Sequence, residues 1–203
     1  MSAALTESWP ILPEAPLNAA GADSEAFLRV GCPSYRDAAR YLNGLPYGRN
    51  TDRADFRRVL SERRGTCSTK HALLAAVALE QNLPVSLMIG VYDMTEANTP
   101  GVGPVLSAHG LDSIPEAHCY LRYAGRRVDI TRSGVSPDAP IARFHDEWTI
   151  TPSQIGAHKL MLHQRFLRNW LRARPEISIS FAELWSIREA CIRELGEART
   201  SDS

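Results

Sequence analysis

The chain has 203 residues, 44% hydrophobic and 23% charged, a balance typical of a globular protein with one buried core. Its 23 basic residues equal its 23 acidic residues, which excludes a general electrostatic attraction to nucleic acid or to an anionic membrane. Residues 1–16 lack the basic start and apolar stretch of a signal peptide, and no apolar run approaches the roughly 20 residues that span a bilayer. We therefore expect a cytoplasmic protein that binds no membrane and whose cysteines are free thiols.

The first third of the chain predicts a tail and then two helices. Residues 1–22 are rich in Ala and Pro and lack periodicity, so we expect a tail that lies over the domain. Apolar side chains recur at helical spacing over residues 34–42, and a second short helix is expected around residues 56–60. The candidate anchors of the tail are Trp9, Ile11 and Leu12.

The middle third predicts a helix followed by strands. A third helix is expected from Cys67 to residue 80 or 81, and the alternating, β-branched residues 84–94 predict a strand. Residues 95–115 are dense in Gly and Pro and predict a long loop, which either covers a cleft and selects a substrate or is a surface loop without such a role. Two further strands are expected within residues 116–131.

The last third predicts a pair of helices. Thr151 with Gln154, and Ser180 with Glu183, have the spacing of capping boxes that open helices. Helices, then antiparallel strands, then helices indicate an α+β fold. The chain divides into a tail (1–22), a core (23–150) and a C-terminal helical extension packed on that core (151–203).

The position of Cys67 is the first indication of chemistry. A thiol at the start of a helix meets free backbone N–H groups and the positive end of the helix dipole, and both favour the nucleophilic thiolate. Gly65 allows a tight turn into this helix, and the same N–H groups could hold the oxyanion formed when the sulfur attacks a carbonyl. The alternative interpretation is a small buried hydrophobic residue.

A base and an orienting group are predicted on the hairpin. If its turn centres on Ala124-Gly125, then His118 and Asp129 are diagonal neighbours on one face of two paired strands, within reach of each other. The opposite face is apolar, so we expect it to be buried in the hydrophobic core. It carries Cys119, Leu121, Val128 and Ile130.

These three residues, in this order, resemble a known family. The segments "GTCS", "HCYL" and "VDIT" are similar to the transglutaminase-like superfamily, whose members share a papain-like core and a Cys-His-Asp triad. The resemblance covers about residues 35–131. It implies that N-terminal helices pack on an antiparallel sheet and that Cys67, His118 and Asp129 are catalytic. Ser68 stands where that family usually has a large aromatic residue, and the last third has no counterpart.

The resemblance also implies a reaction. Cys67 would attack an amide or peptide carbonyl, His118 would pass the proton to the leaving amine, and Asp129 would orient the imidazole. Water would then resolve the thioester, and no metal or organic cofactor is required. The expected partner is a peptide, a protein or a small amide substrate. Acyl transfer to an amine, or deamidation of glutamine, is the alternative reaction.

Several residues around the triad are candidate substrate contacts. Tyr47 and Asn50 could line the site or supply an oxyanion donor, although a plain turn is the alternative. The loop at residues 95–115 adds Glu96, Asn98 and His109. The full set beside the triad is Tyr47, Asn50, Thr66, Ser68, His71 and Tyr120.

Other interpretations remain open. A zinc site formed by Cys67, His71, His118 and Cys119 lacks the usual ligand spacing, so we predict no metal. A binding module without turnover, or a redox sensor in which Cys119 resolves an oxidised Cys67, are rival functions. The basic residues of the first C-terminal helix predict a solvated face and no nucleic-acid surface. They are Lys159, His163, Arg165, Arg168, Arg172 and Arg174.

Overall fold

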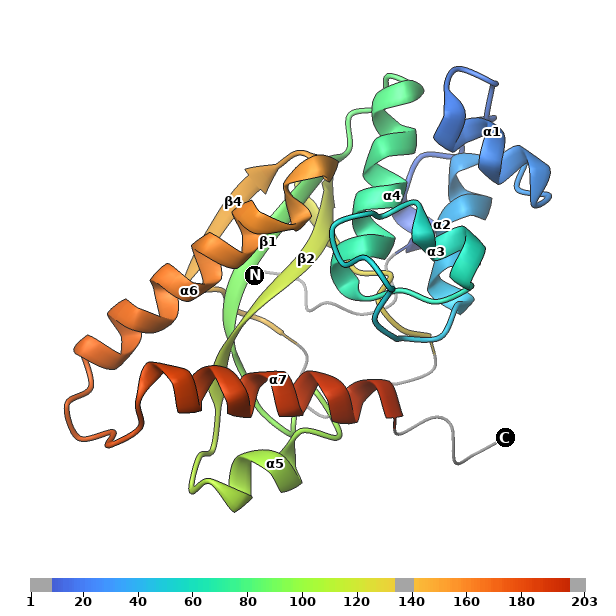
Figure 1. Ribbon diagram of the computed structural model, residues 1–203. Helices are drawn as coiled ribbons and strands as arrows, with labels where there is room; N and C mark the ends of the chain where they lie inside the picture. The colour runs from blue at the N-terminus through green and yellow to red at the C-terminus, as the bar shows by residue number, and fades with distance from the viewer. Residues whose placement is uncertain (1–8, 134–140, 198–203) are drawn as a thin grey trace.

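The computed structural model describes residues 9–133 and 141–197. Its helices are α1 (Ala22–Arg29), α2 (Tyr35–Gly44), α3 (Arg58–Glu62), α4 (Cys67–Glu80), α5 (Gly103–Ala108), α6 (Ala157–Arg172) and α7 (Phe181–Glu197), with short 3-10 helices at Trp9–Ile11 and Pro152–Ile155. Its strands are β1 (Ser86–Met94), β2 (Ile114–Tyr123), β3 (Arg126–Val128) and β4 (Asp146–Ile150). They form an antiparallel sheet in the order β3-β2-β1-β4, which confirms the α+β class (Figure 1).

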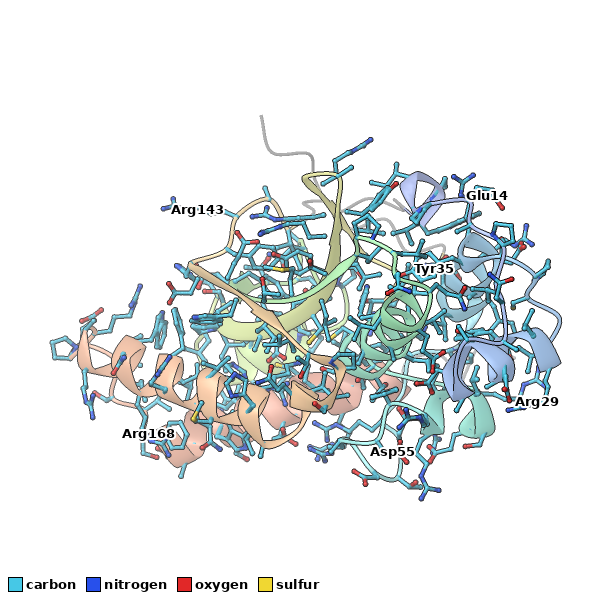
Figure 2. The ribbon with its side chains drawn as sticks, turned by 90° about the horizontal axis from the view of Figure 1, so that it is seen from above. Glu14, Arg29, Tyr35, Asp55, Arg143 and Arg168 are labelled. Carbon is cyan, nitrogen blue, oxygen red and sulfur yellow. The ribbon has the colours of Figure 1, made fainter. Side chains whose placement is uncertain are left out.

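The sheet separates two clusters of buried side chains. Leu87, Ile89 and Val91 of β1 belong to one cluster and the intervening Met88 and Tyr92 to the other, as expected when side chains alternate along a strand. Helices α1, α2 and α4 contribute to the first cluster, whereas α5 and α7 contribute to the second. Figures 1 and 2 show α1 to α4 grouped at one side of the sheet and α6 with α7 at the other.

Helix α4 is the central element of the first cluster. Every residue from Cys67 to Ala78 is buried, so this helix has no solvated face over most of its length. Its N-terminus is closed by a capping box between Thr66 and Thr69, and the helix begins at Cys67 as the sequence predicts.

The β2-β3 hairpin has the predicted turn and register. Ala124 and Gly125 have φ angles of 48° and 73°, the left-handed conformation that a two-residue hairpin turn requires. Leu121 pairs with Val128 and Tyr123 with Arg126. The predicted apolar face is confirmed, because Cys119, Leu121, Val128 and Ile130 all lie in the first cluster.

Three elements differ from the sequence-based expectations. Helix α1 was not predicted, and neither was β4, a short and largely solvated edge strand that pairs with β1. Residues 95–115 are not a continuous loop, because they contain α5, which packs against α7. The three candidate anchors of the N-terminal segment are confirmed: Leu12 is fully buried, and Trp9 and Ile11 pack on the first cluster. Residues 1–8 lie outside the described residues.

The turn residue Ala124 offers a test of this fold. A left-handed backbone costs an alanine about 1 kcal/mol, whereas asparagine adopts it readily. Ala124→Asn should therefore raise the free energy of unfolding by about 0.5–1 kcal/mol, measured by urea denaturation. The control is Ala142→Asn at an exposed position without a positive φ. An equal gain in both variants would contradict the turn assignment.

Candidate active site

The sulfur of Cys67 lies at the start of α4 in a charged environment. The residue is only 8% exposed, and burial alone would raise the pKa of its thiol. The ammonium of Lys159, the imidazole of His118 and a hydrogen bond from the backbone N–H of Cys119 act in the opposite direction. Together they lower the pKa of Cys67 to about 6. The thiolate is thus the main form of Cys67 at neutral pH.

His118 and Asp129 form the pair that the hairpin register predicts. His118 Nε2 lies 2.7 Å from Asp129 Oδ2, and the imidazole also interacts with the thiol of Cys67. Burial disfavours the charged imidazole, but the carboxylate of Asp129 and the thiolate of Cys67 raise the pKa of His118 well above its usual value. Cys67 and His118 therefore form a thiolate–imidazolium pair.

Asp129 is held in place by the residue two positions later. The backbone N–H and the hydroxyl of Thr131 donate hydrogen bonds to Oδ1, at 2.8 and 2.5 Å. Oδ2 remains directed at His118. These donors and the imidazolium hold the pKa of Asp129 well below its usual value, although burial acts to raise it. The carboxylate is therefore charged at neutral pH.

His71 connects the nucleophile to the strand that carries Asp129. Its Nδ1 lies 2.7 Å from the carbonyl oxygen of Cys67, and the backbone N–H of Ile130 donates to its Nε2 at 2.9 Å. A carbonyl only accepts and an N–H only donates, so the proton is on Nδ1 and the ring is neutral. Burial lowers the pKa of His71 to about 4, in agreement with a neutral ring.

Lys159 of α6 completes the surroundings of the thiol. Its Nζ donates to the hydroxyl of Ser68 at 2.6 Å and lies 4.0 Å from the sulfur of Cys67. The prediction of a solvated face is wrong for Lys159 and His163, which are 9% and 2% exposed, whereas Arg165, Arg168 and Arg172 are exposed as predicted. Figure 2 shows Arg168 at the outer edge of the molecule.

A spacing argument could have identified Lys159. It precedes Leu162 by three residues and His163 by four, so all three lie on one helix face together with the buried Leu167 and Trp170. The apolar periodicity of α6 therefore places the ammonium on the buried side.

A cavity of about 290 Å³ opens beside Cys67. Its wall contains four of the predicted substrate contacts: Tyr47, Asn50, Thr66 and Ser68. Both donor contacts of the Asn50 amide are to Glu62 and to the carbonyl of Arg64, so this amide holds the loop and is not directed at an oxyanion. None of Glu96, Asn98 and His109 lines the cavity, so the predicted substrate-selecting role of that segment is not supported.

Two other predicted contacts lie away from the cavity. His71 is fully buried, and both its ring nitrogens are occupied by hydrogen bonds with backbone groups. Tyr120 points to the second cluster, where its ring stacks on Phe144 and its hydroxyl donates to Glu147. Neither side chain is therefore placed to touch a substrate.

An ion-pair network forms the far wall of the cavity. Arg188 of α7 binds both carboxylate oxygens of Glu116 at 2.6 Å and also binds Glu189. Arg49 donates to Glu189 at 2.8 Å. The guanidinium of Arg188 outweighs the effect of burial and lowers the pKa of Glu116 to about 2. These charges compensate one another and fix α7 against β2.

Cys119 is poorly suited to resolve an oxidised Cys67. Its thiol is fully buried in the first cluster, and burial raises its pKa, which disfavours the thiolate that would have to react. Across residues 9–133 and 141–197, no three His, Cys, Asp or Glu side chains are grouped to hold a metal ion. No helix in the same two ranges combines the length and the apolar character needed to cross a membrane.

Comparisons with known proteins add no identification. No protein-family model, no curated protein and no solved structure matches this chain. Any functional conclusion therefore depends on the geometry of the site itself.

The bridging role of His71 can be measured as stability. His71→Leu would leave the N–H of Ile130 buried without its partner and would remove the side-chain hydrogen bond to the carbonyl of Cys67. We expect a loss of about 1–3 kcal/mol in the free energy of unfolding, measured by urea denaturation. The control is His109→Leu at an exposed histidine, which should change little.

The comparison of wild type with His71→Leu also predicts a pH dependence of the free energy of unfolding, with a definite sign. The folded-state pKa of His71 is about 4, below its usual value of 6.5, so the unfolded chain binds the proton first as the pH falls. The stabilisation by His71 is complete above pH 6.5 and declines toward pH 4. The stability difference between wild type and His71→Leu should therefore narrow over this range. A constant difference would contradict a neutral His71.

Proposed function

We propose that this protein is a thiol hydrolase of the transglutaminase-like type, which cleaves an amide or peptide bond through a thioester on Cys67. The observation that carries the proposal is the arrangement of Cys67, His118 and Asp129. The imidazole of His118 lies 2.7 Å from the carboxylate of Asp129 and interacts with the thiol of Cys67. Nucleophile, base and orienting group are thereby in contact in the order that thiol catalysis requires.

The first half-reaction follows from the charges. The thiolate of Cys67 attacks the carbonyl carbon, and the first backbone N–H groups of α4 are nearest to the resulting oxyanion. The C–N bond then breaks, and His118 gives its proton to the departing amine. Asp129 keeps the imidazole in the tautomer and orientation that this transfer needs. The product is a neutral thioester on Cys67 and a neutral His118.

The second half-reaction restores the thiolate. His118 takes a proton from water as the water oxygen attacks the thioester carbon, and the C–S bond breaks with its electron pair on the sulfur. Hydrolysis is preferred to acyl transfer because it needs only water as the acceptor. An amine added to the acylated protein would form an amide product if transfer were the reaction.

The state of the thiol is the first test. In wild type, the rate of Cys67 alkylation by iodoacetamide should rise with a midpoint near pH 6. His118→Gln and Asp129→Asn should move the midpoint toward the free-thiol value of about 8.5, because each removes a charge that stabilises the pair. The matched control is His109→Gln, an exposed histidine outside the cavity. A wild-type midpoint at the free-thiol value would rule out an assembled triad.

Acylation is the second test. With p-nitrophenyl acetate, wild type should release one equivalent of nitrophenolate in a burst and gain the mass of one acetyl group on Cys67. Cys67→Ala should show no burst, and Asp129→Asn should slow the turnover that follows by at least about 100-fold. An acetylated Cys67 that never turns over, in wild type and Asp129→Asn alike, would indicate a binding module that has lost catalysis.

A further inference from the structure

Lys159 stands out among the cations of the cavity because no carboxylate neutralises it. Arg188 is paired with Glu116, and Arg49 with Glu189. Within the parts of the chain that the structure describes, no carboxylate oxygen lies within ion-pair distance of Lys159 Nζ. Its contacts are the hydroxyl of Ser68 at 2.6 Å and the sulfur of Cys67 at 4.0 Å. The residue is only 9% exposed and lines the cavity.

The counter-ion of this ammonium changes during the proposed reaction. In the free protein, the thiolate of Cys67 supplies the negative charge. Once the sulfur has formed a thioester, that charge is gone, while the ammonium of Lys159 is still buried beside it. The carboxylate of Glu116 also acts on Lys159, but both its oxygens are already bound by Arg188. A buried ammonium without an anion is unfavourable, so the acylated site favours an acyl group that carries its own negative charge.

The rest of the cavity agrees with a small acyl group. Ile155, Trp185 and Ile192 give part of its wall an apolar surface, and the volume is about 290 Å³. Such a space suits a short carbon chain better than a folded polypeptide segment. An anionic end of that chain would find Lys159 only a few ångströms from the bond that forms on the sulfur.

We propose that the cavity binds the carboxylate of a small anionic acyl substrate, with Lys159 as its counter-ion. This inference deepens the proposed thiol hydrolase function and rests on it for the identity of the reacting atom. It assigns to α6 a role in substrate selection that none of the triad residues provides. Ser68 holds the ammonium in position because its hydroxyl oxygen accepts a hydrogen bond from Lys159 Nζ.

Two alkylating reagents that differ only in charge test the proposal. In both reactions the sulfur of Cys67 forms a C–S bond, and iodide leaves with the electron pair of the C–I bond. Iodoacetate carries a carboxylate one carbon from the new bond, whereas iodoacetamide is neutral. The ratio of the two rates at one pH is independent of how much thiol is ionised, because both reagents react with the same thiolate.

The expected result is a shift of that ratio. Relative to N-acetylcysteine, wild type should favour iodoacetate over iodoacetamide by about 10-fold or more, equivalent to about 1.4 kcal/mol. Lys159→Met should abolish most of this preference, and Lys159→Arg should retain most of it. The matched control is Arg165→Met, which removes an exposed charge from the same helix outside the cavity and should keep the wild-type ratio.

The outcomes separate this proposal from the function on which it rests. A wild-type ratio equal to that of N-acetylcysteine would overturn the anionic-substrate proposal without the need for any variant. A ratio unchanged in Lys159→Met would also overturn it and would assign the preference to the imidazolium of His118. A Cys67 midpoint at the free-thiol value would instead refute the triad, and the ratio would still report on the charge preference of the cavity.

Discussion

The first turn of α4 is the constraint on which the rest of the site depends. Lys70 Nζ donates to the carbonyls of Leu45 and Thr131, at 2.6 and 2.8 Å, and is fully buried. The next residue, His71, ties the carbonyl of Cys67 to the backbone of Ile130. One helical turn is therefore fastened both to the segment before it and to the strand end that carries the orienting carboxylate.

The other residues of this turn have equally specific contacts. Thr69 donates to the side chain of Asn50 at 2.8 Å, and Ser68 accepts from Lys159. Gly65 must stay small, because an added Cβ would lie 2.9 Å from the side chain of Lys70. The glycine is thus needed for close packing, which differs from the tight backbone turn that its position suggested. The nucleophile is therefore positioned by contacts from the loop between α2 and α3, from the residues after β3 and from α6.

Buried charge is tolerated at this site because the charges alternate in sign. The carboxylate of Asp129, the imidazolium of His118, the thiolate of Cys67 and the ammonium of Lys159 follow one another in space. Removal of one of these buried charges would leave its neighbour without a counter-ion, which destabilises the fold by several kcal/mol. The arrangement explains why a thiol that is 8% exposed can be ionised near pH 6.

The sequence predicts the parts of the site that depend on local rules. The start of α4 follows from its cap, and the relation between His118 and Asp129 follows from the Ala124-Gly125 turn, because the turn sets the register of the hairpin. The α1 helix could not be predicted in this way. Its first N–H groups are capped by the carboxylate of Glu80, at 3.1 and 2.7 Å, and that residue is more than 50 positions away.

The role of Lys159 could be predicted only in part from the sequence. Its burial could be predicted from the periodicity of α6, but its approach to Cys67 depends on how α6 packs against β2 and the 3-10 helix at Pro152–Ile155. The boundary that the sequence suggests at residue 150 therefore does not coincide with a boundary of the site. Without the last two helices, the thiolate would lose its ammonium neighbour and Glu116 would be left without Arg188. The triad geometry belongs to the core, whereas the charge balance that makes the thiol reactive is shared with the C-terminal helical pair.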